Sequence, residues 1–404
     1  MARGRRGLGA LLVVVGCGGG PAGTTGAEAD ASGSSAPPAT GGASSGVDPT
    51  TGGAGSGAVS TTMVEGTGPS GQTTTAAAGS SGADPGSSSG TDAEPPPRPP
   101  ELEVFVIGDP DDADVRPGGP AAIVMGGGAD VDEAFTWQLQ YVGGGDVVIL
   151  RTSGADGYNE YLYTEIGGVD SVETLMVTSQ ALAGEPYVAW TIAHAEAVFI
   201  AGGDQATYLQ AWKDTPVEAA IMAVWQRGGV VGGTSAGAAV LGEFIYAAYN
   251  DSVIEDEALL DPYNKYMSFE RDLLALPPLA GVITDTHFTA RRRLCRLIGF
   301  VARMVADGWG EPVVGVGVDE ETALVVDPAG LATVIGVGKV HLLHSAGAPQ
   351  QCVAGKTLEY AGLDWYALGP GDSVQLPAAV PKDVPKLTLS ASMGALDPAY
   401  DCVE

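Results

Sequence analysis

The feature that most constrains the fold is a repeated alternation of short apolar runs with segments of helical spacing. The run at 121–125, AAIVM, is followed by a helical pattern with acidic residues in its first turn. The later runs GDVVILR, VETLMV, AVFI and GVV are each followed by a helical segment or a turn. Strands this apolar are buried on both faces, which is typical of a parallel sheet covered by helices on each side. We therefore expect an α/β fold with a mainly parallel sheet.

After Pro312 the helical segments stop. The runs VVGVGV, TALVV, ATVIGV and KVHLLH follow one another as strand-like segments. This change predicts a C-terminal β-rich extension with antiparallel strands.

The first hundred residues have a different composition. Residues 1–17 contain three arginines and an apolar run of about ten residues, too short to span a bilayer, and are interpreted as a signal peptide. The segment Val14-Val15-Gly16-Cys17 resembles a bacterial lipobox, in which Cys17 would carry lipid; a plain signal peptide cut nearby is the alternative. We expect an exported protein that is lipid-anchored at the bacterial cell envelope, with an outer membrane as one location, or secreted.

Residues 18–100 are mostly Gly, Ser, Thr, Ala and Pro, with almost no large apolar side chains. Such a segment buries too little surface to offset the entropy of ordering, so it is predicted to be a disordered tether. Residues 101–404 are expected to form one folded domain. The whole chain has a net charge of −30, which argues against nucleic acid as a partner and restricts membrane contact to the lipid anchor.

The stretch VVGGTSAGAAVLG at 230–242 contains Gly233-x-Ser235-x-Gly237, the spacing of a nucleophile elbow. The same spacing occurs at 42–46 and 86–90, but no strand precedes it there. Ser235 follows an apolar run, and reactive groups gather at the carboxyl ends of parallel strands. Ser235 is therefore a candidate nucleophile.

A serine nucleophile needs a base, and the chain has four histidines. His287 follows the strand-like run GVITDT, whose end should reach the same sheet edge as Ser235. His194 lies near a predicted helix end, where a structural role is expected. His341 and His344 lie three apart in a strand, on opposite faces, which argues against a shared metal. His287 is therefore the candidate base.

Four arginines follow His287 closely. If Thr289 caps the next helix, Arg292, Arg293 and Arg296 lie opposite its buried stripe, and Arg291 lies in its first turn. A solvated basic face is one interpretation. A carboxylate-binding cluster is the other, and it is favoured in so acidic a chain.

The segment FIAGGDQ ends another predicted strand. An amide near Gly203 and the amide of Ala236 are candidates for an oxyanion hole, and Gln205 offers a donor and an acceptor to a substrate amide. The glycine run at 126–128 is interpreted as a tight turn, because it lacks the spacing of a dinucleotide site.

The acid that would orient His287 stays open at this point. Asp319, Glu320 and Glu321 follow an apolar strand in GVGVDEET. Asp285 is two residues before His287, so in a strand its side chain would lie on the same face. Each is a candidate acid, and Asp285 is also a candidate substrate contact.

Taken together, GGDQ, GTSAGA, DTHFTARRRLCRL and GVGVDEETAL, in this order, resemble the cyanophycinase family, relatives of the aspartyl dipeptidase E serine peptidases. The resemblance covers roughly 121–326. It implies a three-layer α/β sandwich similar to class I glutamine amidotransferases, a homodimer, and no metal or cofactor.

The resemblance also implies residue roles: Ser235 as nucleophile, His287 as base and Glu320 as its acid. It implies a serine-type exopeptidase that hydrolyses cyanophycin, an arginine-bearing polyaspartate, to β-aspartyl-arginine. The alternatives are an aspartyl dipeptidase or other small-peptide serine peptidase of the same family, and a non-catalytic surface-binding lipoprotein. The implied substrate-pocket residues are Gln205, Asp285, Arg291, Arg293 and Arg296.

The cysteines add two expectations. Cys295 stands where glycine is expected in many relatives, so its side chain is expected to narrow the pocket. Cys352 and Cys402 are a plausible disulfide pair in an oxidising compartment.

Overall fold

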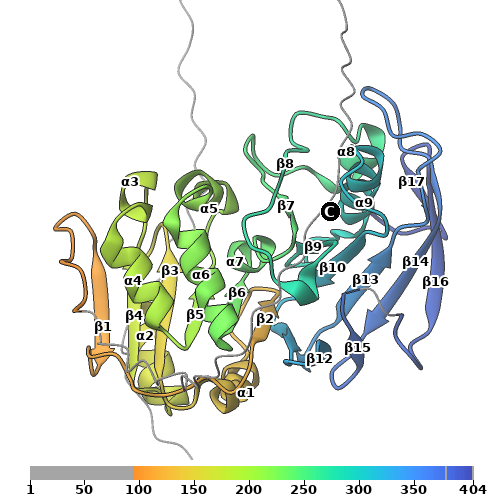
Figure 1. Cartoon of the computed structure of the whole chain (residues 1–404). Coiled ribbons are helices and arrows are strands. Elements are labelled where there is room, and N and C mark those ends of the chain that lie inside the picture. The colour runs from red at the N-terminus through yellow and green to blue at the C-terminus, as the bar shows by residue number, and fades with distance from the viewer. Residues whose placement is uncertain (1–93, 378–379, 403–404) are drawn as a thin grey trace, which may run out of the picture. The chain divides into compact units, whose positions relative to one another are not determined.

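The computed structural model describes residues 94–377 and 380–402. The predicted signal peptide with its lipobox Cys17, and the predicted tether as far as position 93, lie outside the described residues. The described part forms two sheets with helices packed on them (Figure 1).

The first sheet, called sheet A, has nine strands in the order β1-β4-β3-β5-β6-β2-β11-β12-β15. The block β4-β3-β5-β6-β2 is parallel, and the other neighbours are antiparallel. Its strands are β1 Val104–Gly108, β2 Ala121–Met125, β3 Asp146–Arg151, β4 Ser171–Met176, β5 Ala197–Ile200, β6 Val230–Thr234, β11 Thr322–Val326, β12 Leu331–Gly336 and β15 Ser373–Gln375.

The second sheet, called sheet B, has eight strands in the order β17-β16-β14-β13-β10-β9-β7-β8. Among the described strands of this sheet, β9 pairs in parallel with β7 and β10, and the other pairings are antiparallel. Its strands are β7 Phe244–Tyr246, β8 Phe269–Arg271, β9 Val282–Asp285, β10 Val314–Val318, β13 Val340–His344, β14 Tyr360–Leu368, β16 Lys386–Ser392 and β17 Ala395–Asp397.

The helices lie between the strands in the chain. They are α1 Asp132–Val142, α2 Gly157–Glu160, η1 Tyr161–Ile166, α3 Gln180–Ala183, α4 Pro186–His194, α5 Gln205–Trp212, α6 Pro216–Arg227, α7 Ala236–Ala239, α8 Glu255–Leu260, η2 Pro277–Leu279 and α9 Leu294–Ala306. No helix in the described ranges is long and apolar enough to cross a membrane.

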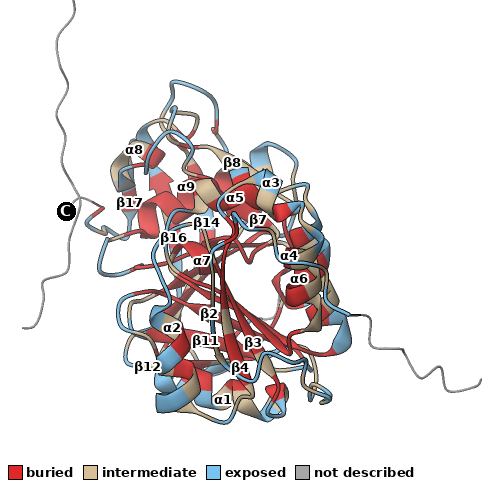
Figure 2. Ribbon diagram, turned by 90° about the vertical axis from the view of Figure 1, so that its left-hand side faces the viewer, coloured by how far each residue is buried: buried red, intermediate tan, exposed pale blue. Residues whose placement is uncertain are grey.

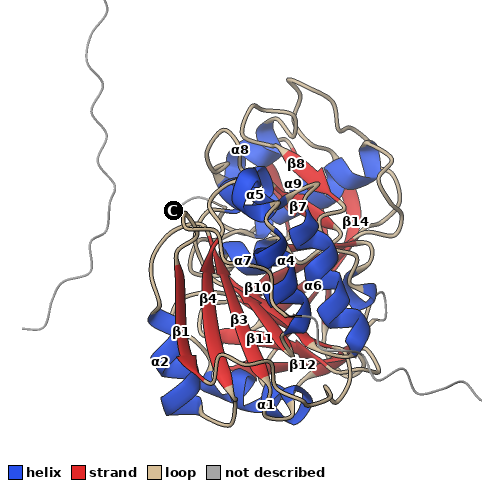
Figure 3. Ribbon diagram, turned by 60° about the vertical axis from the view of Figure 1, so that its left-hand side comes forward, coloured by secondary structure: helices blue, strands red, loops and turns tan. Residues whose placement is uncertain are grey.

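The parallel strands of sheet A are apolar because helices cover both of their faces. Val124 and Leu150 pack in one core with α4, α5 and α6, whereas their neighbours Ile123 and Ile149 pack in another core with α1 and η1. This alternation follows from the two-residue period of a strand. Figures 2 and 3 show these buried strands between the two groups of helices.

The predicted α/β character and the C-terminal β-rich region are confirmed, but a mainly parallel sheet is wrong. Six of the fifteen pairings between described strands are parallel. The region after Pro312 also divides between the sheets. Strand β10 pairs in parallel with β9 of sheet B, and β11 returns to pair with β2 of sheet A. Hydrophobic patterning does not reveal which sheet a strand joins.

Candidate active site

Ser235 lies at a sharp turn between β6 and α7, as the spacing predicted. Its backbone has φ 51° and ψ −120°, a conformation that is costly for a residue with a side chain. The flanking glycines allow this turn. A Cβ on Gly233 would lie 2.6 Å from the carbonyl of Gly237, and a Cβ on Gly237 would collide with the carbonyl oxygen of Ile200. The elbow therefore needs both glycines.

Ser235, His287 and Glu320 form one hydrogen-bonded chain. The Oγ of Ser235 is 2.8 Å from Nε2 of His287, and Nδ1 of His287 is 2.6 Å from Oε1 of Glu320. Among the candidate acids, Asp285 and Asp319 contact other groups instead. Glu320 is therefore the acid that the fold brings to the imidazole.

The three side chains come from both sheets. Ser235 follows β6 of sheet A, whereas His287 follows β9 and Glu320 follows β10, both of sheet B. The expectation that Ser235 and His287 share one sheet edge is therefore wrong. The two sheets meet at this point, where the amide of His287 donates to the carbonyl of Gly126 over 2.8 Å.

The glycine run 126–128 after β2 is part of the site, although the sequence suggested only a tight turn. Gly127 has φ +91°, and a Cβ there would lie 2.6 Å from Nε2 of His287. Gly128 has φ +78°, and a Cβ there would lie 3.0 Å from the Cβ of Glu320. Glycines at a strand end in a predicted sheet were the available signal for this role.

A cavity of about 540 Å³ opens beside Ser235 and His287. Its wall includes every residue predicted for the substrate pocket and the oxyanion hole: Gly203, Gln205, Ala236, Asp285, Arg291, Arg293 and Arg296. Sequence reasoning missed part of the wall, including the polar and aromatic segment after β7. The missed residues include Thr207, Gln210, Tyr246, Tyr249, Asp251 and Ser252.

The backbone around Gly203 comes close to Ser235. A Cβ on Gly202 would lie 3.5 Å from the Cβ of Ser235. The hydroxyl of Tyr208 donates to the carbonyls of Ala201 and Gly202 at 3.0 and 2.9 Å, which fixes this turn. Ala236 is the first residue of α7, so its amide belongs to a helix N-terminus.

Arg293 and Arg296 do not lie on a solvated face. Both are buried, at 8% and 2% exposure, and both bind the buried carboxylate of Asp285. Arg296 binds it with two nitrogens, at 2.8 and 2.6 Å, and also donates to Oγ of Ser252. Arg291 is exposed and lines the cavity. The cluster therefore already holds one internal carboxylate.

The predicted helix start at Thr289 is also wrong. Helix α9 begins at Leu294, because Arg292 has φ +48°, which interrupts the helical path. Arg292 instead contacts Asp401 at 3.0 Å. Helical spacing alone does not reveal this turn.

Burial and neighbouring charges together set the pKa values of His287 and Asp285. Burial lowers the pKa of His287, the hydrogen bond that His287 donates to Glu320 opposes this shift, and Arg291 and Arg293 add to it. Burial alone would raise the pKa of Asp285, but Arg296 and Arg293 outweigh it, so that pKa is lowered. Near neutral pH, His287 is therefore neutral and Asp285 is ionised.

The remaining histidines do not line the cavity beside Ser235. Nδ1 of His194 donates to the carbonyl oxygen of Trp190 at 2.7 Å, within α4, as expected of a structural residue. His341 and His344 are both on β13. The described part of the chain contains no group of three or more His, Cys, Asp or Glu side chains that could hold a metal ion.

The cysteine expectations are wrong. The disulfide joins Cys295 and Cys402, whose Cα atoms are 5.7 Å apart, and Cys352 is a buried free thiol. Cys295 is fully buried in α9 and does not line the cavity, so it does not narrow the pocket. Sequence spacing cannot establish disulfide pairing, since it depends on which segments the fold brings together.

A serine at a strand-to-helix turn, bonded to a histidine that is bonded to a carboxylate, defines a site of the serine hydrolase class. Comparison with known proteins narrows this class. The model of peptidase family S51 matches residues 156–269, which include Ser235 but end before His287.

The chain is 30% identical over 177 residues to a cyanophycinase of Synechococcus elongatus, covering 44% of this chain and 50% of that protein. It is 31% identical over 178 residues to a cyanophycinase of Trichormus variabilis, covering 44% and 54%. A solved peptidase from an acI-B1 Actinobacterium aligns with 18% identity and a TM-score of 0.44, over 64% of this chain and 97% of that one.

The chain thus spans about half the length of the curated relatives that it matches. The resemblance to the cyanophycinase family is confirmed. The similarity is thus to a peptidase family and to cyanophycinases, over part of their length.

Proposed function

We propose that the chain is a serine-type exopeptidase that hydrolyses cyanophycin, multi-arginyl-polyaspartate, to β-aspartyl-arginine. The observation that carries the proposal is the hydrogen-bonded chain Ser235–His287–Glu320 at the wall of an arginine-lined cavity. The similarity to cyanophycinases supports the choice of substrate.

In this mechanism Ser235 attacks a backbone carbonyl carbon of the substrate. His287 takes the Oγ proton as the new C–O bond forms, and gives it to the leaving amine as the C–N bond breaks. Water then attacks the acyl-enzyme carbonyl carbon. His287 takes a proton from this water and gives it to Oγ of Ser235 as the acyl C–O bond breaks, which releases the product acid. Glu320 holds the imidazole in the tautomer that has Nε2 free to accept.

The oxyanion would be stabilised by backbone amides near Gly203 and at Ala236. Both residues line the cavity beside Ser235, and the amide of Ala236 starts α7. Amides held by a rigid turn stabilise developing negative charge without reorganising.

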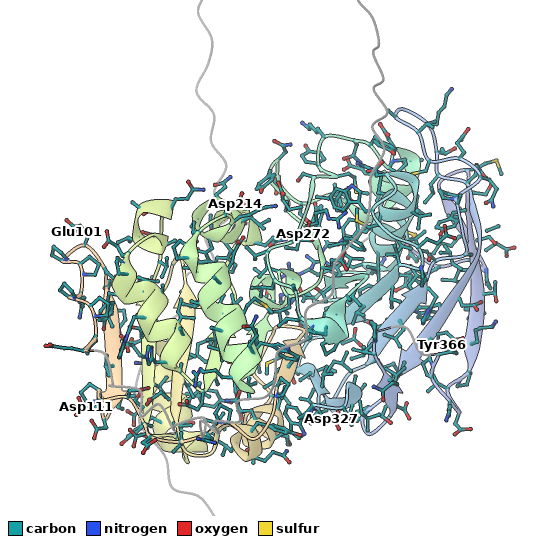
Figure 4. All side chains as sticks on the ribbon, viewed as in Figure 1. Glu101, Asp111, Asp214, Asp272, Asp327 and Tyr366 are labelled. Carbon is teal, nitrogen blue, oxygen red and sulfur yellow. A yellow bond between two sulfur atoms is a disulfide. The ribbon has the colours of Figure 1, made fainter. Side chains whose placement is uncertain are left out.

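The substrate carboxylate would be bound mainly by Arg291, which is exposed at the cavity. Arg293 and Arg296, held by Asp285, would shape the wall and add positive potential. Gln205 would bind a substrate amide. The substrate guanidinium groups suit an acidic surface, which includes Glu101, Asp111, Asp214 and Asp272 (Figure 4).

We further propose the three-layer α/β sandwich of the class I glutamine amidotransferase type, and a homodimer. The first proposal is supported by the five-stranded parallel block of sheet A, with α4, α5 and α6 on one face and α1 and η1 on the other. Export with a lipid anchor at Cys17 is also proposed. The Cys295–Cys402 disulfide supports it, since disulfides persist in oxidising compartments.

The test is incubation of the protein with purified cyanophycin, with product mass measured over time. We expect β-aspartyl-arginine from the wild type, and a loss on the order of 10⁴–10⁶-fold in kcat for Ser235→Ala. Ser390→Ala, on β16, is the matched control and should keep full activity.

Each alternative gives its own result. Cleavage of Asp-X dipeptides without release of β-aspartyl-arginine would identify an aspartyl dipeptidase. Polymer binding by the wild type without any hydrolysis would identify a surface-binding lipoprotein. Equal hydrolysis by wild type and Ser235→Ala would exclude the serine mechanism.

A further inference from the structure

The carboxylate of Asp319 connects the segments that carry His287 and Glu320. Its Oδ1 accepts from the amide of Thr289 at 2.8 Å, and its Oδ2 accepts from the amide of Lys339 at 2.9 Å. Thr289 is two residues after His287, and Asp319 directly precedes Glu320. One side chain therefore links the turn after β9 to the end of β10.

His341 supports this carboxylate from β13. Its Nε2 lies 3.4 Å from Oδ1 of Asp319 and 3.3 Å from Oγ1 of Thr289. The imidazole stacks on Trp365, with ring planes 4° apart. The side chains of His341 and Asp319 are 7% and 13% exposed, so water does not readily replace these contacts.

Further contacts join the same two segments. The amide of Phe288 donates to the carbonyl of Val318 at 3.2 Å, and the ring of Phe288 packs against His341 with centroids 4.7 Å apart. Gly317 leaves room for that ring, since a Cβ there would lie 2.6 Å from Cγ of Phe288. The turn that carries His287 is thus held along the last residues of β10.

We propose that Asp319, supported by His341, is a positioning residue that sets the geometry of the His287–Glu320 hydrogen bond. This inference rests on the proposed serine peptidase function. Asp319 does not line the cavity, so it acts through His287 and Glu320 and not on the substrate. Its bonds to two backbone amides are of the charge-assisted kind, which are short and directional.

The charge of Asp319 is maintained over the working pH range. Burial would raise its pKa, but the contacts with His341 and Thr289 outweigh burial and lower the pKa to about 2. The carboxylate is therefore ionised wherever His287 is neutral.

The kinetic test uses Asp319→Asn and Asp319→Ala in the full chain. Asparagine would place an NH₂ group, which cannot accept, opposite one of the two backbone amides of Thr289 and Lys339. One of these two hydrogen bonds should therefore be lost. We expect kcat on cyanophycin to fall about 10- to 100-fold, with KM little changed because the cavity wall is intact. Wild-type kcat in both variants would refute the proposal.

Asp327→Asn is the matched control. Asp327 also accepts from two backbone amides, those of Ala329 and Leu331, but it lies in the β11–β12 turn (Figure 4). Its substitution should leave kcat at the wild-type value.

The second test reports on His287 without needing turnover. The Cε1 proton of His287 is followed by NMR as a function of pH in the wild type and in His341→Ala and His341→Gln. Glu320 raises the pKa of His287, so a loosened bond should lower that pKa in His341→Ala. Replacing His341 removes no negative charge from the surroundings of His287. A lower pKa of His287 in this variant therefore reports a changed hydrogen bond between His287 and Glu320. His341→Gln, which keeps a donor for Asp319, should restore part of the shift.

The two tests separate the two proposals. A wild type without peptidase activity would refute the proposed function, while a lowered His287 pKa in His341→Ala would still support the positioning role. An active wild type with unchanged His287 pKa in His341→Ala would refute the positioning role alone.

Discussion

Glu320 contacts His287 through one oxygen, and its own side chain is 40% exposed while that of His287 is 11% exposed. A carboxylate at this place fixes the tautomer and stabilises the imidazolium that forms when Ser235 is deprotonated. We therefore expect Glu320→Gln to lower kcat by about 10²–10⁴-fold. The neighbouring Glu321→Gln is the control, and equal rates in both variants would contradict this role.

The pH dependence of activity follows from His287. Its pKa lies below the ordinary value of 6.5, mainly because of burial, and only its neutral form accepts the Ser235 proton. The acidic limb of kcat/KM should therefore lie below pH 6.5, with activity falling as the pH falls through the His287 pKa. In Glu320→Gln the acidic limb of the pH profile should shift to a lower pH, because Glu320 raises the pKa of His287. A limb above 6.5 in the wild type would count against His287 as the base.

Asp285 is predicted to act on stability more than any other charged residue of the site. Asp285→Asn leaves Arg296 and Arg293 without their buried carboxylate, so we expect a loss of about 3–5 kcal/mol in the free energy of unfolding, measured in urea. Asp364→Asn, in the exposed pair with Lys386, should change it little. If Asp285→Asn changed the free energy of unfolding as little as Asp364→Asn does, the prediction would be wrong.

The same ion pairs predict an acid sensitivity. The folded pKa of Asp285 is lowered, so its stabilisation is fully present above the unfolded pKa, near 3.8, and is lost as the pH falls through the folded value. Wild-type stability should therefore decline below pH 4 more steeply than that of Asp285→Asn. Parallel curves for the two proteins would show that Asp285 is not responsible.

At the scale of elements, the turn after β2 lies where the two sheets meet, since Gly126 accepts from the amide of His287 and Gly127 from that of Glu321. Gly127→Ala and Gly144→Ala both place a side chain at similar positive φ values, +91° and +84°, at a cost of about 1–2 kcal/mol each. Only the new methyl group at position 127 meets His287, since nothing lies within 4 Å at position 144. We expect similar stabilities but activity lost only in Gly127→Ala. Equal activities would show that the turn does not position His287.

The sequence predicted the elements that depend on local pattern. The apolar runs placed β2 and β6, and the glycine spacing placed the turn at Ser235, because burial on both faces and close backbone approach leave a direct trace in the residues. It did not predict the start of α9, since the positive φ of Arg292 depends on the fold around it. It also did not predict that β9 and β6 belong to different sheets, because pairing between distant strands is not a local property.

At the scale of the whole described part, the site depends on the contact between the two sheets. Sheet A supplies Ser235, and sheet B supplies His287 and Glu320. Thr284 Oγ1 of β9 donates to the carbonyl of Ala238 of α7 at 2.8 Å, which joins the two sheets next to the elbow. A change that loosens either sheet should therefore reduce activity before the protein unfolds.

The Cys295–Cys402 disulfide ties the C-terminal segment to α9 and closes a loop of 107 residues that contains β10 to β17. A link across so long a loop removes much entropy from the unfolded chain, so Cys402→Ser should lower the free energy of unfolding by about 2–4 kcal/mol in urea. Cys352→Ala, which removes the buried free thiol, is the control and should not break a crosslink. Mass mapping of peptides without reduction should find 295 joined to 402. A peptide joining 352 to 402 would contradict this pairing, and equal stability of Cys402→Ser and wild type would contradict the stabilising effect of the crosslink.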